Sequence, residues 1–84
     1  MYYVYILELN NGQLYTGYTS DLKRRILEHK HGKCKFTSQR LPIKLVHYEA
    51  YSFEPDARNR EKFLKTSDGR RVLSSQLKDY FEKR

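Results

Sequence analysis

The side chains of this chain that could perform chemistry are two tyrosines, an arginine, a histidine and a glutamate. Arg25 and His29 are four residues apart in a segment with a helical pattern, so both lie on one face of that helix. Glu61 lies on the apolar side of a second expected helix, where a carboxylate is costly unless it is paired or bound to a cation. Arginine holds anionic oxygens and histidine moves protons. Together with Tyr5 and Tyr15, these residues form a set suited to cutting phosphodiester bonds.

Each of these residues also has a structural explanation. Glu61 can form a salt bridge with one of the many Arg and Lys side chains. Arg25 can cap the edge of a sheet, or it can pair with Glu49 or Glu61. His29 can be a partly buried residue at the C-terminal end of its helix, where the helix dipole favours it. What favours the functional reading is convergence, because all five residues can face one surface of the sheet.

Three segments have the pattern of β-strands. Residues 2–7 read Tyr-Tyr-Val-Tyr-Ile-Leu and are apolar on both alternating faces, which is typical of a strand covered on both sides. Asn10-Asn11-Gly12 signals a tight turn, and residues 14–18 resume the strand pattern, so the two segments predict a β-hairpin. Residues 43–51 predict a third strand. Gly17, inside the second strand, indicates a bulge or a close backbone approach.

The first expected helix runs from about residue 20 to residue 30. Ser20 or Thr19 is expected to cap it, with Asp21 in its first turn. Residues 31–42 then read as a basic loop.

Two further helices are expected after the third strand. The second opens at residues 52–55, turns Ala57, Leu64 and Phe53 inward, and ends at Ser67-Asp68-Gly69. The third covers residues 70–82, where apolar residues recur with a 3.6-residue period. The order β-β-α-β-α-α predicts an α+β fold: one three-stranded antiparallel sheet with flanking helices, in a single domain over residues 1–84.

Composition and charge narrow the class of partner. The 84 residues contain 17 Lys and Arg against 10 Asp and Glu, a net charge of +7. Residues 20–44 hold eight basic and two acidic side chains, and residues 58–84 hold nine and four. Such a surface attracts polyanions, although charge on helix faces also serves solubility. Cys34 is the only cysteine, which excludes an intrachain disulfide. No segment approaches the roughly 20 apolar residues of a membrane span, so we expect a cytoplasmic protein that does not bind membranes.

Several motifs occur in order and at fixed spacing. They are Tyr3-Val4-Tyr5, Tyr15-Thr16-Gly17, the Arg25 to His29 spacing, and Ala57-Arg58-Asn59-Arg60-Glu61. In this combination the chain resembles the GIY-YIG nuclease superfamily. It is most similar to the small single-domain bacterial branch and to the nuclease module of the bacterial excinuclease. The resemblance covers nearly the whole chain.

The resemblance implies a metal-dependent endonuclease that hydrolyses phosphodiester bonds, with DNA as the expected substrate. Glu61 would hold one divalent ion, Mg²⁺ or Mn²⁺, together with the scissile phosphate. Arg25 would contact that phosphate, and Tyr5 would activate or orient the attacking water, with Tyr15 and His29 as helpers. The glycine of the second motif, Gly17, would let the backbone approach the tyrosines or the phosphate.

The phosphates of the nucleic-acid backbone are expected to contact a set of cationic side chains: Arg24, Lys33, Lys35, Arg40, Lys44 and Lys65. One departure from the family is the absence of an asparagine in residues 62–71, for which Lys65 is a candidate substitute. Two alternatives stay open: a catalytically inactive nucleic-acid-binding module, and a protein that docks a partner. In the nuclease reading, a protein partner would supply targeting.

Overall fold

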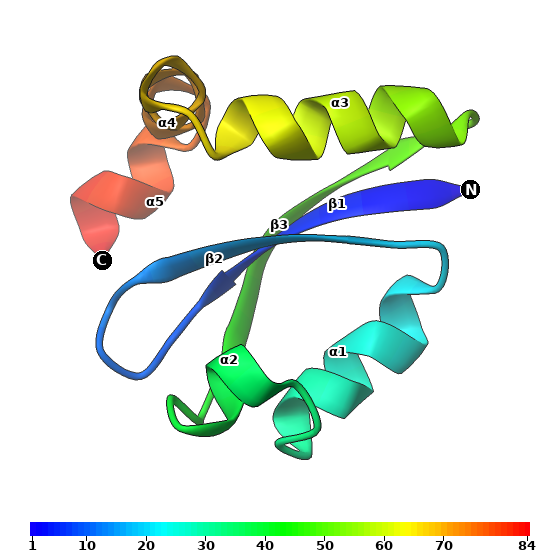
Figure 1. Ribbon diagram of the computed structural model, residues 1–84. Coiled ribbons are helices and arrows are strands. Elements are labelled where there is room, and N and C mark those ends of the chain that lie inside the picture. Colours follow the sequence, from blue (N-terminus) through cyan, green and yellow to red (C-terminus); the bar gives the residue numbers. More distant parts are fainter.

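Three antiparallel strands form the centre of the computed structural model, which describes residues 1–84 (Figure 1). The strands are β1 (Tyr2–Glu8), β2 (Leu14–Thr19) and β3 (Lys44–Tyr51), in the order β2-β1-β3. Because β1 is the central strand and helices pack on both of its faces, its residues Val4 to Leu7 are at most 1% exposed. The predicted three-stranded antiparallel sheet is confirmed, and so is the prediction that the strand of residues 2–7 is covered on both sides.

Helices cover both faces of the sheet (Figure 1). On one face lie α1 (Leu22–Lys30) and α2 (Lys35–Ser38); on the other lie α3 (Glu54–Leu64) and α4 (Ser67–Gln76), followed by α5 (Lys78–Lys83). The alternation of β1 separates two apolar clusters. Val4 and Ile6 pack with Ala57 of α3, whereas Tyr5 and Leu7 pack with Ile26 of α1. The α+β class and the order β-β-α-β-α-α are as expected from the sequence. None of the helices has the length and apolar character that a bilayer span requires.

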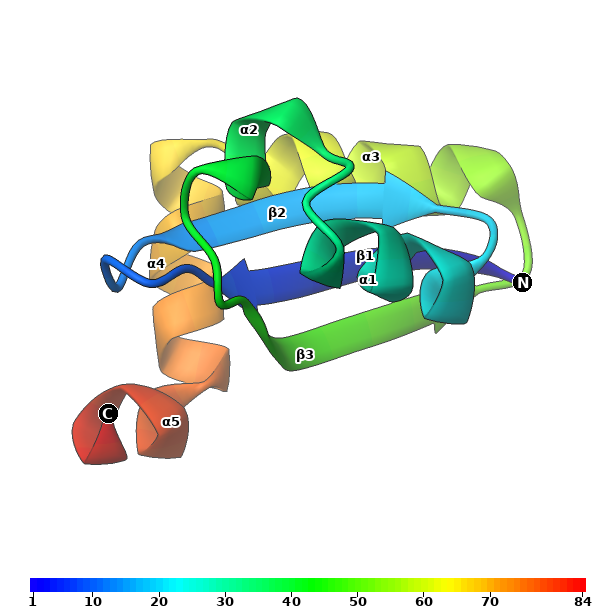
Figure 2. The same ribbon diagram turned by 90° about the horizontal axis from the view of Figure 1, so that it is seen from below.

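The structure corrects the start of the first helix and the region that follows it. Asp21 is the N-cap rather than a first-turn residue, and its side chain accepts a hydrogen bond from the backbone N–H of Arg24 at 3.1 Å. Neither Ser20 nor Thr19 has this role. Within the expected loop of residues 31–42, the chain forms the short helix α2, which folds back over β2 (Figure 2).

The C-terminal helices also differ from the prediction. Ser67, Asp68 and Gly69 begin α4 instead of ending α3, because the side chain of Thr66 caps the new helix by accepting from the N–H of Gly69 at 3.0 Å. The expected helix of residues 70–82 is broken at Leu77, so α4 and α5 are separate.

Phe53 does not face inward. It is 69% exposed, because it is the N-cap residue of α3 and has extended backbone angles.

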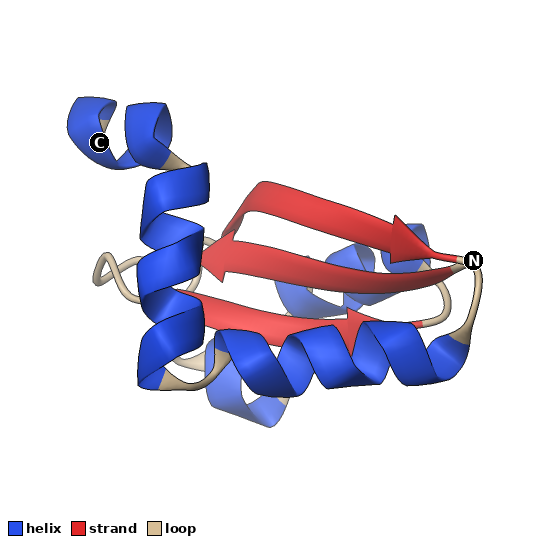
Figure 3. Cartoon of the chain, turned by 90° about the horizontal axis from the view of Figure 1, so that it is seen from above, coloured by secondary structure: helices blue, strands red, loops and turns tan.

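The outer edge of β2 is where the two helical layers meet. Seen from below, α2 and α3 both extend on the β2 side of the sheet (Figure 2), and the view from above agrees (Figure 3). Figure 3 also shows α4 crossing the ends of the strands, roughly perpendicular to α3. Side chains from opposite faces of the sheet can therefore approach one another around this edge.

Candidate active site

The position of the Tyr5 hydroxyl depends on a glycine in the neighbouring strand. In the β1–β2 register, Tyr5 pairs with Gly17, and the tyrosine ring lies over the space that a side chain would fill. A Cβ atom added to Gly17 would lie 2.8 Å from Cε1 of Tyr5 and closer still to Cζ and the hydroxyl. The close approach expected at Gly17 is thus made by the ring of Tyr5, which brings the hydroxyl toward the outer edge of the sheet.

A chain of buried hydrogen bonds begins at this hydroxyl. Tyr5 Oη lies 2.9 Å from Nε2 of His29, and Nδ1 of His29 lies 2.8 Å from Oγ1 of Thr37. His29 and Thr37 are both 0% exposed. The Thr37 hydroxyl also donates to the carbonyl of Cys34, at 3.5 Å. With its one proton on that carbonyl, Thr37 accepts from Nδ1–H, and Nε2 is then free to accept from the Tyr5 hydroxyl.

Burial sets the protonation states of this pair. It raises the pKa of Tyr5 to about 12, although the hydrogen bond with Arg25 acts in the opposite direction. It also lowers the pKa of His29 below its ordinary value, and the positive charge of Arg25 lowers it further. At neutral pH, Tyr5 is therefore protonated and His29 is neutral, which is the arrangement of a proton donor facing an acceptor.

Arg25 lies beside the hydroxyl of Tyr5 rather than in open solvent. Its hydrogen bonds with Tyr5 and Glu28 raise the pKa of its guanidinium. Nη1 donates to Oε1 of Glu28 at 3.0 Å, and Nη2 lies 3.7 Å from Sγ of Cys34. The carboxylate partner of Arg25 is therefore Glu28, from the next turn of its own helix, and not Glu49 or Glu61.

Tyr15 completes this group. Its ring centroid lies 6.3 Å from that of Tyr5 and 5.4 Å from that of His29. Burial raises the pKa of its hydroxyl, the nearby thiol of Cys34 adds to this effect, and the charge of Arg25 opposes it. Four of the five predicted residues thus gather on the α1 face of the sheet, at the β2 edge.

The fifth residue, Glu61, belongs to α3, which packs on the opposite face, so the expected convergence of all five residues on one surface of the sheet is wrong for Glu61. Its side chain is 19% exposed, and its carboxylate accepts from Nζ of Lys65 at 3.0 Å. Lys65 lines the same cleft as Tyr15 and Thr16 of β2, so this ion pair lies at the β2 edge. Glu61 itself makes no hydrogen bond or ion pair with the other four residues. A ligand that contacts both Glu61 and the other four residues would have to reach around the outer edge of β2.

The chemistry of the donor set bears on the expected metal ion. No three His, Cys, Asp or Glu side chains form a group that could hold one. Mg²⁺ keeps most of its water ligands in proteins and needs only one or two carboxylates together with substrate phosphates. A single carboxylate whose only ion-pair partner is a flexible, half-exposed lysine fits that requirement.

The cationic residues expected to contact phosphates do not form one patch. Lys33 and Lys35 are exposed in the connection to α2 and in α2 itself. The guanidinium of Arg40 lies 4.8 Å from the centre of the Phe36 ring, which in turn packs on Tyr15. Arg24 is exposed on α1, whereas Lys44 begins β3, the strand at the opposite edge of the sheet. Lys65 lies on the α3 side of the β2 edge.

Thr37 is the residue of this arrangement that the sequence did not identify. It lies eight residues after His29 in a segment that reads as a loop. The spacing of His29 and Thr37 in the sequence does not predict their contact, which forms only because α2 folds back over the sheet. The only available signal was a threonine, a residue able to satisfy a buried histidine, close to a predicted site.

Comparisons with known proteins agree with this geometry. A family model described as the GIY-YIG catalytic domain matches residues 1–72. The UPF0213 protein SAG0778 of Streptococcus agalactiae is 47% identical over 64 residues, which cover 75% of this chain and 73% of that protein. The UPF0213 protein HQ_3675A of Haloquadratum walsbyi is 44% identical over 66 residues, covering 77% and 74%.

A solved structure is also similar. The solution structure of the UPF0213 protein BH0048 from Bacillus halodurans is 40% identical and superposes with a TM-score of 0.59, covering 92% of this chain and 86% of that one. The family model spans most of the chain, and the relatives are similar over most of their own lengths. The chain therefore belongs to the GIY-YIG catalytic domain family.

Proposed function

We propose that this protein is a metal-dependent endonuclease that hydrolyses phosphodiester bonds in DNA. Membership of the GIY-YIG family implies nuclease-type activity. The observation that carries the finer proposal is the buried hydrogen-bond chain from Tyr5 through His29 to Thr37, which begins beside Arg25. A tyrosine hydroxyl, a neutral imidazole and a guanidinium together provide a route for a proton and a site for a phosphate.

Proton transfer is the first role of this group. A tyrosine with a pKa of about 12 is not ionised at neutral pH, so Tyr5 does not act as a preformed anion. Instead, Tyr5 gives its proton to Nε2 of His29 as it takes one from the attacking water, which becomes the nucleophile. His29 accepts because it is neutral, and its Nδ1–H stays bonded to Thr37. Of the two tyrosines, Tyr5 is the one with a hydrogen bond to this acceptor.

Phosphate binding is the second role. The guanidinium of Arg25 is half-buried and has donors beyond the one that contacts Glu28. A planar guanidinium can donate two parallel hydrogen bonds to phosphate oxygens. In this position it would stabilise the negative charge that develops on the phosphoryl oxygens during attack.

Glu61 is the residue that would hold Mg²⁺ or Mn²⁺. When bound, such an ion neutralises charge on the phosphate and stabilises the leaving oxygen. Glu61 must exchange its bond with Lys65 for this, and the exposure of Lys65 leaves that side chain free to turn away. Lys65 would then be available to contact a phosphate itself.

The experiment is a cleavage assay on plasmid, branched and single-stranded DNA, with RNA alongside, in Mg²⁺, in Mn²⁺ and in excess chelator. We expect metal-dependent cleavage that falls by about a hundredfold or more in Arg25→Ala and Tyr5→Phe. Glu61→Ala should also lose activity. Lys62→Ala, an exposed neighbour of Glu61 on the same helix, is the matched control and should cleave like the parent protein. Salt-sensitive DNA binding without cleavage, unchanged by Glu61→Ala, would instead indicate an inactive nucleic-acid-binding module.

A further inference from the structure

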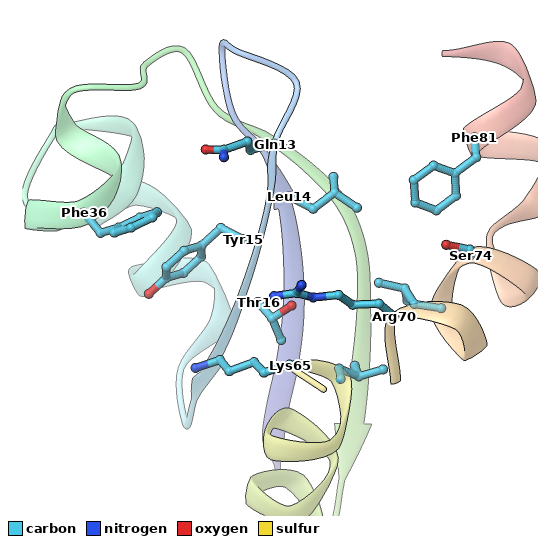
Figure 4. Close-up of a pocket in the computed structure, with 11 residues that line it drawn as sticks. Gln13, Leu14, Tyr15, Thr16, Phe36, Lys65, Arg70, Ser74 and Phe81 are labelled. Atoms are coloured by element: carbon cyan, nitrogen blue, oxygen red, sulfur yellow. The ribbon is translucent and has the colours of Figure 1, made fainter. Parts of the chain in front are cut away.

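A cleft of about 550 Å³ lies on the other side of the β2 edge from the hydrogen-bond chain of Tyr5, His29 and Thr37. Residues of β2 form one wall, and α4 with the ends of α3 and α5 forms the other (Figure 4). Leu14, Leu73 and Phe81 supply apolar surface, whereas Lys65 and Arg70 supply positive charge. No acidic residue lines the cleft. Its chemistry therefore suits an anion that carries an apolar group.

Arg70 is the charge in this cleft that no carboxylate balances. Its side chain reaches from α4 toward Thr16 of β2 (Figure 4), and it forms no ion pair. The next residue, Arg71, differs: it pairs with Asp68 and does not line the cleft. Two consecutive arginines of one helix thus have different surroundings, and only Arg70 faces the cleft with its charge uncompensated.

The cleft is continuous with the proposed active site through Tyr15. This residue lines the cleft, and its ring also packs against His29. Phe36, which stacks on Tyr15 at 5.5 Å between ring centroids, lines the same end of the cleft. A polymer bound at Arg25 and extending past Tyr15 would enter the cleft without leaving the protein surface.

We propose that the cleft binds the nucleotide next to the scissile phosphate, with the phosphate of that nucleotide held by Arg70. This proposal rests on the proposed function, because it takes the ligand to be the nucleic-acid strand that is cut. The guanidinium of Arg70 pairs with the phosphate in the fork geometry that arginine provides. The sugar and base lie against Leu14 and Phe81, whose apolar surface can contact any base. The contact gives affinity and fixes the path of the strand, not the choice of sequence.

The test compares Arg70→Ala with Arg71→Ala, which removes the same charge from the adjacent position of the same helix. Binding of a labelled DNA oligonucleotide is measured by fluorescence anisotropy in chelator, where no cleavage occurs, over a range of salt concentrations. We expect Arg70→Ala to weaken binding about tenfold or more, as loss of a charge-assisted contact does. The slope of log K against log salt should fall by about 0.7 to 0.9. Arg71→Ala should bind within about twofold of the parent protein.

A second measurement locates the contact along the strand. The oligonucleotide is shortened by one nucleotide at a time on each side of the cleavage position. On one side only, removal of the adjacent nucleotide should abolish the difference between the parent protein and Arg70→Ala. Arg70→Lys should restore the salt slope. Thermal unfolding of each variant shows whether the folded state is retained, which is expected because Arg70 is exposed.

The outcomes separate this proposal from the nuclease proposal. Equal effects of the two alanine variants on affinity and salt slope would overturn the proposal that the cleft binds a nucleotide. A difference in affinity between the parent protein and Arg70→Ala that persists with every shortened oligonucleotide would overturn it as well. Cleavage by the parent protein together with equal binding by both variants refutes the cleft alone. Binding that depends on Arg70 in a protein that never cleaves would support the cleft as a nucleic-acid site and refute the nuclease.

Discussion

Substitution of Gly17 by alanine tests the link between the sheet and the chemistry. The added methyl group would lie 2.8 Å from Cε1 of Tyr5, and closer to the hydroxyl. Ordinary contacts of a Cβ atom begin at 3.4 Å, so Cε1 alone must shift by 3.4 − 2.8 = 0.6 Å. Tyr5 is 1% exposed between β2 and α1, so its ring cannot move without changing its geometry with His29.

The size of the effect follows from these distances. The hydrogen bond between Tyr5 and His29 is 2.9 Å long. The hydroxyl that makes it lies closer to the added methyl group than Cε1 does and must shift by more than 0.6 Å, which is enough to stretch the bond to the limit of hydrogen bonding. Misplacement of a reacting group by about 1 Å can lower a rate about a hundredfold. We therefore expect Gly17→Ala to lose between about tenfold and a hundredfold of kcat. Overpacking of the interior typically costs about 1–3 kcal/mol of folding free energy, so the fold should survive in a less stable form.

A double-mutant cycle isolates the cause. Cleavage rates are measured for Gly17→Ala, Tyr5→Phe and the double variant, at a temperature where thermal unfolding shows all three to be folded. If the methyl group acts through the Tyr5 hydroxyl, the double variant is about as active as Tyr5→Phe alone. Independent losses that multiply in the double variant would refute the reasoning. Activity of Gly17→Ala within about threefold of the parent protein would refute it as well.

Two further substitutions test the buried polar groups. Thr37→Val removes the acceptor of Nδ1–H of His29, so we expect a loss of stability of about 1–3 kcal/mol. It should also change the acid limb of the pH–rate profile, because activity falls as His29 becomes protonated, and the pKa of His29 lies below its ordinary value of 6.5. Thr37→Ser should restore both the stability and the pH–rate profile. Burial raises the pKa of Glu49. Hydrogen bonds with Tyr51, Arg60 and the imidazole of His47 outweigh this effect and bring the pKa of Glu49 to about 2. Its ionised form therefore stabilises the fold above pH 4.5, and a stabilisation of about 3 kcal/mol is lost as the pH falls from 4.5 toward 2. In urea unfolding across this pH range, Glu49→Gln should have a correspondingly smaller pH dependence, and an unchanged slope would contradict the assignment.

Much of the fold was predictable because the strongest patterns in the sequence are local. Residues 2–7 are apolar on both faces, and only a central strand between two helical layers buries such a segment. The boundaries after α3 were not predictable for a physical reason. Ser67-Asp68-Gly69 contains residues that both end and begin helices, so their direction depends on the cap supplied by Thr66. The break at Leu77 is likewise hidden, because Leu73, Leu77 and Phe81 keep a helical spacing of four residues through it.

The candidate site was predictable only to the extent that the sequence indicates which residues share a face of the sheet. Tyr5 and Tyr15 share a face because Leu7, two residues from Tyr5, pairs with Tyr15 in the register of the hairpin. Nothing in the spacing of the sequence assigns Glu61 to the other face, because that depends on which way the chain crosses after β3. The contact of Arg25 with Glu28 is an i,i+3 pair that helical spacing alone can predict, whereas the expected long-range partners Glu49 and Glu61 do not contact Arg25.

The arrangement explains how 84 residues can provide chemistry on both sides of a sheet. An edge strand normally exposes unpaired backbone groups that invite aggregation, and proteins usually cover or charge such an edge. Here the edge of β2 is flanked by α2 on one side and α3 on the other (Figure 2), and the cations Lys65 and Arg70 line a cleft beside it. Gly17 is the residue in this edge strand that lets the Tyr5 ring pass over it. In the proposed endonuclease, the proton acceptor on one face and the carboxylate on the other act on a single strand of nucleic acid that lies across the edge of β2.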